Sequence, residues 1–428
     1  MHRQPLTDQL PYQFHPPRMN PLYVRAARPY RRHLLRSEHK VFEYDIAGTE
    51  HLSPLLDRGD GLLIAPNHSD RADGLVLLDL ADRLGRPFCA MAAYQIFAGN
   101  GGLRHWLFSR LGIFPVDREG TARAAFKAGV EVLSAGKYPL LVFPEGEVYH
   151  LADRLTPLRD GAAALAVAAA RKRAEAGKTA WIVPVGLKYR FLDGFDPQPA
   201  LSSLMDELEN RFTWWHHRER SLVERIYRYA EGMLALKELE YYGAARPGPL
   251  PERIAALRSH ILDAIEDRHA GTRRSDPVPV RVKELRRACL DALADPATTP
   301  EQADSLCRDL NDLFVVVQLF SYPGDYARTA PTVEQLAEIL MKFEEDVLGV
   351  EYATPRGPRR AVLRIGPPID VGEHLRSAAK PRLAVPMLTA ELEQRIQALL
   401  DAIGPGRPIG DFTAESAEKS AERRDILN

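Results

Sequence analysis

Residues 61–74 read GLLIAPNHSDRADG, a short apolar run that leads into a polar turn. An apolar run closed by Pro66 and Asn67 predicts a buried strand that ends in a turn, with a helix starting near Asp73. The turn can bring His68 and Asp73 together, the residue types of a general base and of the carboxylate that orients it. Taken alone, the pair is more simply explained by a turn histidine and a helix-capping aspartate.

Three later positions carry chemistry at or near predicted strand ends. Arg118 follows a short apolar run, and its planar guanidinium suits a phosphate, although an ion pair with a neighbouring acid is the simpler explanation. Glu145 follows another apolar run and precedes Gly146, which permits close backbone approach; an ordinary exit from a strand explains it as well. Pro184 interrupts a third run, so that strand is expected at an edge or a bulge.

Apolar runs and helical patterns alternate along much of the chain. The predicted strands are 61–66, 87–92, 112–116, 138–143, 180–189 and 360–366, and the predicted helices are 73–84, 103–111, 120–135, 159–176 and 388–403. This alternation predicts an α/β core with a mostly parallel sheet and flanking helices. Sites in such sheets gather at the carboxyl ends of the strands, where His68, Arg118 and Glu145 all fall.

A long helical region interrupts this pattern. Its predicted helices are 199–241, 249–270, 277–294, 300–320 and 331–348. The predicted organisation is a basic N-terminal arm (1–40), the first part of the core (41–190), an all-helical insertion (191–358), the last core strand and helix (359–404) and a polar tail expected to be disordered (405–428). The adjacent Trp214 and Trp215 in the insertion indicate core packing, a lid, a dimer contact or a carrier-protein dock.

Four segments taken in order resemble the glycerolipid acyltransferase family, typified by the lysophosphatidic acid acyltransferases. They are His68…Asp73, Gly112…Arg118, Phe143-Pro144-Glu145-Gly146 and Val183-Pro184. The basic-x-Gly-Ala helix start that follows the third block in the family is matched by Arg159-Asp160-Gly161-Ala162. One departure concerns the third block, which commonly continues Thr-Arg where this chain has Glu147-Val148, so a basic residue for an acceptor phosphate is missing.

The resemblance implies acyl transfer from a thioester to a hydroxyl, with acyl-CoA or acyl-carrier protein as co-substrate and no other cofactor. His68 would be the general base oriented by Asp73, and no enzyme nucleophile is required. Arg118 would hold an acceptor phosphate, Glu145 and Gly146 would position the acceptor, and Pro184 would shape the acyl-donor side. The implied acceptor is a lysophospholipid, above all 1-acylglycerol 3-phosphate. The alternative is a non-catalytic lipid-binding or scaffolding protein that acts through its helical insertion.

Composition limits the partners. The 428 residues carry a net charge of −1, which gives no reason to expect nucleic acid as a partner. Cys89, Cys289 and Cys307 have no paired or metal-like spacing, so we expect a reducing compartment and no metal site. The N-terminus lacks a signal-peptide pattern and no apolar run reaches the ~20 residues of a membrane span. We therefore expect a cytoplasmic protein that is peripheral at the membrane.

The basic segment 18–40 is the candidate membrane contact. It holds six arginines and one lysine against the single acid Glu38, with apolar and aromatic residues between them. Such a mixture suits an anionic membrane surface. A solvated, partly ordered arm broken by Pro21 and Pro29 explains the same composition equally well.

Overall fold

A computed structural model describes residues 12–97, 102–117, 123–269, 271, 273, 275–378, 380 and 383–409. The chain forms two compact units. The sheet unit consists mainly of Gln9–Phe195 and Gly357–Arg407, and the helical unit mainly of Asp196–Arg356.

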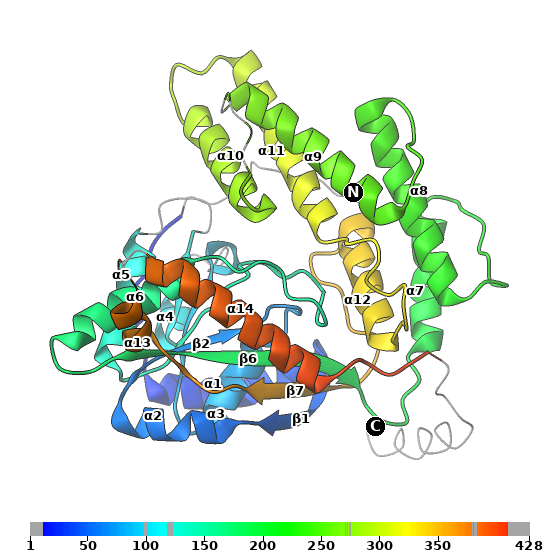
Figure 1. The fold of residues 1–428 in the computed structure, drawn as a ribbon. Helices are drawn as coiled ribbons and strands as arrows, with labels where there is room; N and C mark the ends of the chain where they lie inside the picture. The colour runs from blue at the N-terminus through cyan, green and yellow to red at the C-terminus, as the bar shows by residue number, and fades with distance from the viewer. Residues whose placement is uncertain are drawn as a thin grey trace. The chain divides into compact units, whose positions relative to one another are not determined.

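The sheet unit is built on one mixed sheet, in agreement with the predicted α/β class (Figure 1). The spatial order is β1-β7-β6-β2-β5-β3-β4, with β8 beside β6. The parallel pairs are β1–β7, β6–β2, β2–β5, β5–β3 and β3–β4, whereas β7 and β8 run antiparallel to β6. The strands are β1 (Val41–Ala47), β2 (Gly61–Pro66), β3 (Cys89–Ala93), β4 (Ile113–Val116), β5 (Leu140–Leu141), β6 (Ala180–Phe191), β7 (Arg359–Ile365) and β8 (Ile369–Asp370).

Helices cover both faces of this sheet. Along β2, Leu63 and Ala65 belong to the apolar cluster under α5, α6, α13 and α14, while Ile64 belongs to the cluster with α1 and α3. Burial on both faces explains why this strand is an unbroken apolar run. The helices are α1 (Pro21–Ser37), α2 (Ser53–Arg58), α3 (Asp73–Arg83), α4 (Leu103–Arg110), α5 (Arg123–Ala135), α6 (Gly161–Ala174), α13 (Val371–Ser377) and α14 (Ala384–Ile403), with short 3-10 turns η2 (Thr49–His51) and η3 (Tyr94–Phe97).

The N-terminal segment is not broken at Pro21 or Pro29, so the alternative of an arm broken by its prolines was wrong. Pro21 stands in the first turn of α1, where a missing N–H costs nothing, and the helix continues through Pro29 to Ser37. Arg32 Nε lies 2.9 Å from Asp79 Oδ1 on α3, and Arg31 pairs with Asp82 on the same helix. Both contacts involve residues that follow Pro29, and they hold the helix against α3.

The helical unit contains α7 (Gln198–Asn210), α8 (Leu222–Tyr242), α9 (Leu250–His269), α10 (Val278–Leu293), α11 (Pro300–Phe320), α12 (Val333–Phe343) and a π-helical turn η5 (Glu344–Leu348). The single helix predicted for 199–241 was wrong, because the chain turns between α7 and α8 and Ser221 caps the second helix in a capping box. Trp214 packs over Gly232, whereas 78% of Trp215 is exposed. Trp214 is therefore half-buried against α8, whereas Trp215 is exposed.

Two further expectations concern the ends and the membrane. Pro408 pairs with Thr332 in an isolated bridge, and the predicted tail beyond residue 409 lies outside the described residues. Among the described helices, none combines the length and apolar character that a membrane crossing requires.

Candidate active site

His68 and Asp73 meet just beyond the carboxyl end of β2. His68 Nδ1 lies 2.9 Å from Asp73 Oδ2, because residues 67–72 turn between the strand and α3. The carboxylate accepts the Nδ1 proton, which leaves Nε2 as the lone-pair nitrogen able to take a proton. The imidazole stacks on Phe143 with ring centroids 3.9 Å apart, and 19% of its side chain is exposed. The imidazole is thus fixed in orientation and still open to a reactant.

Asp73 is fully buried and is held by four donors. Its Oδ2 also accepts the backbone N–H groups of Ser69 and Asp70 at 2.9 and 3.0 Å, and its Oδ1 accepts the Tyr189 hydroxyl at 2.8 Å. Burial raises the pKa of the Asp73 carboxyl, and the bond to His68 works against that rise. Burial also raises the pKa of Tyr189 well above 10, so the phenol remains a proton donor.

A buried ion pair supports the same turn. Arg359, the first residue of β7, places Nη1 2.6 Å from Asp70 Oδ2, and its guanidinium lies 4.4 Å from the centre of the Tyr189 ring. Burial alone would raise the pKa of Asp70, but Arg359 outweighs it and holds that pKa below its usual range. The turn that carries His68 is therefore anchored to a strand almost 300 positions later in the chain.

Glu145 connects this turn to the loop after β5. Its Oε1 accepts the His68 backbone N–H at 2.6 Å, and its Oε2 accepts the Thr156 N–H at 3.0 Å and the Thr156 hydroxyl. Burial raises the pKa of Glu145 to about 7, although these donors favour the carboxylate. Because both oxygens are bonded to protein donors, the geometry gives Glu145 a positioning role.

Gly146 brings a basic side chain to the same place. Its φ is +79°, and a Cβ there would lie 2.7 Å from Arg159 Nε, so only glycine lets the guanidinium pack on this backbone. The Arg159 Nε is buried and makes no hydrogen bond among the described residues. A cation therefore reaches the Glu145-Gly146 turn from the start of α6, although the basic residue directly after the turn is missing.

The remaining two predicted site residues are Arg118 and Pro184. Arg118 lies outside the described residues. Pro184 is not at a sheet edge, which corrects that expectation: it stands in β6 opposite Ala65 of β2. Its carbonyl accepts Gly366 N–H at 2.9 Å, so its nitrogen faces the gap where β7 has ended and β8 has not begun. No ladder bond is lost there, which is why a central strand tolerates it.

Sequence patterns did not reveal Tyr189, Arg359 or Thr156 as parts of this site. Tyr189 lies in an apolar strand and Arg359 at the start of one, and neither position has a local signal of its partner. Asp70 lies in the same turn as His68 and Asp73, and the density of charged residues in this turn was the available signal.

A cavity of about 430 Å³ lies near the amino ends of β2 and β6, whereas His68 lies beyond the carboxyl end of β2. It is lined by residues that include Trp181, His374 and Glu391. Trp181 pairs with Leu62 near the amino end of β2, whereas His68 follows the carboxyl end of that strand. The cavity is therefore separate from the dyad.

The fold and the dyad define an α/β domain with a positioned base at the carboxyl edge of a mostly parallel sheet. Residues 44–188 match the family model described as Acyltransferase. This domain belongs to the glycerolipid acyltransferase family, and general acyltransferase activity follows for this part of the chain. The comparison with curated proteins found no match.

Proposed function

We propose that the protein transfers a fatty acyl group from acyl-CoA or acyl-carrier protein to the hydroxyl of a lysophospholipid, with 1-acylglycerol 3-phosphate as the first acceptor to test. The observation that carries the proposal is the hydrogen bond between His68 Nδ1 and the buried carboxylate of Asp73. A non-catalytic lipid-binding protein has no need of an oriented, solvent-open base.

The chemistry needs one proton acceptor. His68 Nε2 takes the proton of the acceptor hydroxyl as its oxygen attacks the thioester carbonyl. The C–S bond then breaks, and the imidazolium returns the proton to the leaving thiolate. Asp73 stabilises the imidazolium between these events, and general-base help of this kind contributes ~10²–10⁴-fold in rate.

A phosphate on the acceptor fits the charges near this base. Arg159, packed on Gly146, supplies a half-buried guanidinium whose Nε is buried and makes no hydrogen bond among the described residues. Arg118, two positions beyond β4 in the sequence, would add a second cation, and Pro184 would shape the acyl-donor side. Glu145 and Gly146 act through the backbone that they hold in place, since both Glu145 oxygens bind protein donors.

An apolar face in the sheet unit supports a membrane surface as partner. We define the α1–α4 face by Leu22, Tyr23, Leu103, Trp106 and Leu107, which are 75%, 37%, 64%, 44% and 39% exposed. The Tyr23 and Trp106 rings touch at 5.4 Å between centroids, so the two helices share one surface. Neither helix contains an acidic residue, whereas both contain arginines. Exposed Trp, Tyr and Leu among arginines suit an anionic lipid surface.

Vesicle co-sedimentation tests this face. The variant Leu103→Glu/Trp106→Glu should lose binding to vesicles containing phosphatidylglycerol, because two negative charges oppose the anionic surface. The matched control is Leu236→Glu/Leu239→Glu on α8, whose side chains are 45% and 50% exposed. Equal binding of both variants and wild type would reject the α1–α4 face as the contact.

The activity itself is tested with labelled long-chain acyl-CoA and lysophosphatidic acid. Wild type should form phosphatidic acid, and His68→Ala should lose at least ~10²-fold. His51→Ala, a histidine of the same unit outside the dyad, is the matched control. Equal turnover by His68→Ala would remove the base from the mechanism, and no turnover across a panel of donors and acceptors would favour the scaffolding alternative.

A further inference from the structure

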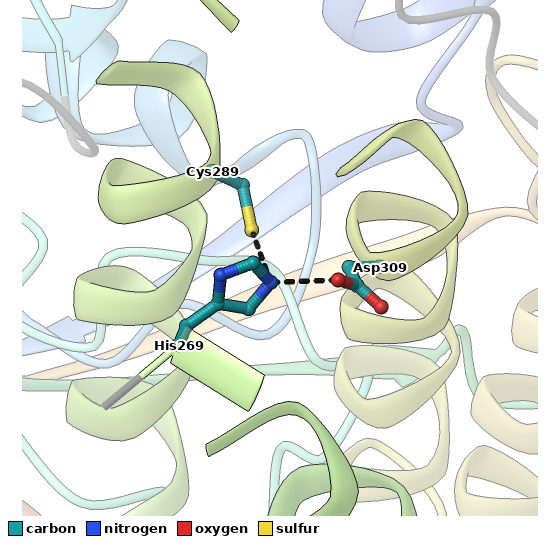
Figure 2. A group of neighbouring side chains, drawn as sticks. All are labelled: His269, Cys289 and Asp309. Atoms are coloured by element: carbon teal, nitrogen blue, oxygen red, sulfur yellow. Dashed lines mark hydrogen bonds and ion pairs between the residues drawn. The ribbon is translucent and has the colours of Figure 1, made fainter. Parts of the chain in front are cut away.

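Three donor side chains of different chemistry meet in the helical unit. His269 ends α9, Cys289 lies on α10 and Asp309 on α11, and their ligand atoms all lie within 4.8 Å of one another (Figure 2). His269 Nε2 is 2.6 Å from Asp309 Oδ2 and 3.8 Å from Cys289 Sγ. Cys289 and Asp309 are buried, and 20% of the His269 side chain is exposed.

This geometry does not suit a nucleophilic triad. In such a triad the thiol and the orienting carboxylate bind opposite ring nitrogens of the histidine. Here both Cys289 and Asp309 face Nε2 of His269, as Figure 2 shows. The one proton on His269 Nε2 is donated to the Asp309 carboxylate, so it is not available to the Cys289 sulfur. The three donors converge on one point, which is what a metal ion requires.

We propose that His269 Nε2, Cys289 Sγ and Asp309 Oδ2 bind one divalent transition-metal ion, with Zn²⁺ the best fit. Zinc takes imidazole nitrogen, thiolate sulfur and carboxylate oxygen at roughly 2.0–2.3 Å, usually in a tetrahedron. Ligand atoms then stand about 3.2–3.6 Å apart. To bind the ion, the distance from His269 Nε2 to Asp309 Oδ2 must increase by about 0.6 Å, and the distance from His269 Nε2 to Cys289 Sγ must decrease slightly. Side-chain rotation can supply both changes.

The surroundings of the trio support this assignment. Arg268 Nη2 lies 2.5 Å from Asp309 Oδ1, so the other carboxylate oxygen is fixed while Oδ2 faces His269. Such outer bonds commonly orient metal ligands. The thiolate is the metal ligand, so a bound cation would displace the Cys289 thiol proton. Water can complete the coordination on the exposed side of His269.

A second group of possible ligands shows the contrast. Asp206, Glu209 and His216 also lie within 4.8 Å, but Arg225 places Nη2 2.6 Å from Asp206 and 2.5 Å from Glu209. Both of its carboxylates are thus already paired with one guanidinium. In the His269 group Arg268 binds only Asp309 Oδ1, and Asp309 Oδ2 and the buried Cys289 thiol both face His269 Nε2.

The proposed ion would tie together three helices of the insertion. Its ligands are 20 positions apart along the chain, one on each of three helices, which is why cysteine spacing predicted no metal site. Binding to the folded state alone stabilises that state, since a preformed site does not exist in the unfolded chain. The ion would therefore be a structural metal that stabilises the helical unit.

Cobalt titration of the full-length protein tests the site without measuring activity. Co²⁺ should bind one to one and give a thiolate-to-cobalt charge-transfer band with visible bands of tetrahedral intensity, and Zn²⁺ should displace it. Zn²⁺ should also raise the Tm. Cys289→Ser should abolish the charge-transfer band, and His269→Gln should weaken binding at least tenfold.

Cys307→Ser is the matched control, because Cys307 lies on α11 outside the trio and should leave all signals unchanged. Circular dichroism of each metal-free variant checks that the helices are intact. No stoichiometric binding by wild type, a charge-transfer band that persists in Cys289→Ser, or one lost in Cys307→Ser would each overturn the proposal.

Discussion

Glu145 should make the stability of this protein depend on pH in an unusual direction. Its side chain is only 4% exposed, and burial raises its pKa from the ordinary value of 4.5 to about 7. Between these two values the folded state keeps a proton that the unfolded state has released. Stability contributed by that proton is fully present below pH 4.5 and is lost as the pH rises through about 7.

The size of the effect follows from the same two values. One pH unit of difference in pKa corresponds to about 1.36 kcal/mol, so the interval from 4.5 to about 7 gives a loss of roughly 3 kcal/mol. The Glu145→Gln variant has no proton to lose. It retains an acceptor oxygen for the His68 N–H but turns an amide group toward the Thr156 donors, which adds a penalty that does not vary with pH.

Urea unfolding of wild type and Glu145→Gln between pH 4.5 and 8 measures the pH-dependent contribution of Glu145 to the free energy of unfolding. The difference between their free energies of unfolding should change by roughly 3 kcal/mol across the range, with wild type losing its advantage as the pH rises. Taking the difference removes the contribution of every other titrating group. Two parallel stability curves would refute the reasoning, because they would show that Glu145 titrates alike in both states.

Other substitutions test the support of the dyad. Tyr189→Phe removes a donor to the buried Asp73 carboxylate, so it should cost about 1.5–3 kcal/mol in denaturant unfolding. Arg359→Met should lower the free energy of unfolding by roughly 3–5 kcal/mol, because it leaves the buried Asp70 carboxylate unpaired. The double variant Asp70→Asn/Arg359→Met should lose less, and thermal unfolding of both variants measures the difference. The Asp70 stabilisation is present above pH 3.8 and is lost in stronger acid, since its folded pKa is lowered. Gly186→Ala puts a Cβ 2.9 Å from a side chain of α14 and should cost about 1–3 kcal/mol; unchanged stability would show that α14 can shift.

The sequence was sufficient for the features that depend on local pattern. The apolar run of β2, the turn after it and the start of α3 at Asp73 all follow from composition and order within a few residues. The order of strands and helices then predicted a mostly parallel sheet, because strands separated by helices pair in parallel. The contact of His68 with Asp73 needed only that one turn.

The features that sequence reasoning missed all depend on distant partners. Tyr189 binds Asp73 from 116 positions away in the sequence, and Arg359 binds Asp70 from 289 positions away. A local sequence pattern does not indicate either contact. The continuous helix through Pro29 is a similar case, since its packing against α3 overrides the local propensity. The buried partners of the dyad became visible only once the strands were placed side by side.

The position of the insertion explains how such distant residues come to support one site. In β6 and β7, Phe191 is paired with Arg359, and Leu192 N–H is 3.0 Å from the Pro358 carbonyl. The helical region therefore replaces the short loop of an antiparallel hairpin. Its two ends are fixed by that hairpin, and lengthening a loop between fixed ends adds only slowly to its closure entropy. Arg359, three residues after the helical unit ends at Arg356, holds Asp70, so the support of the dyad is complete only when the chain returns to β7 in register.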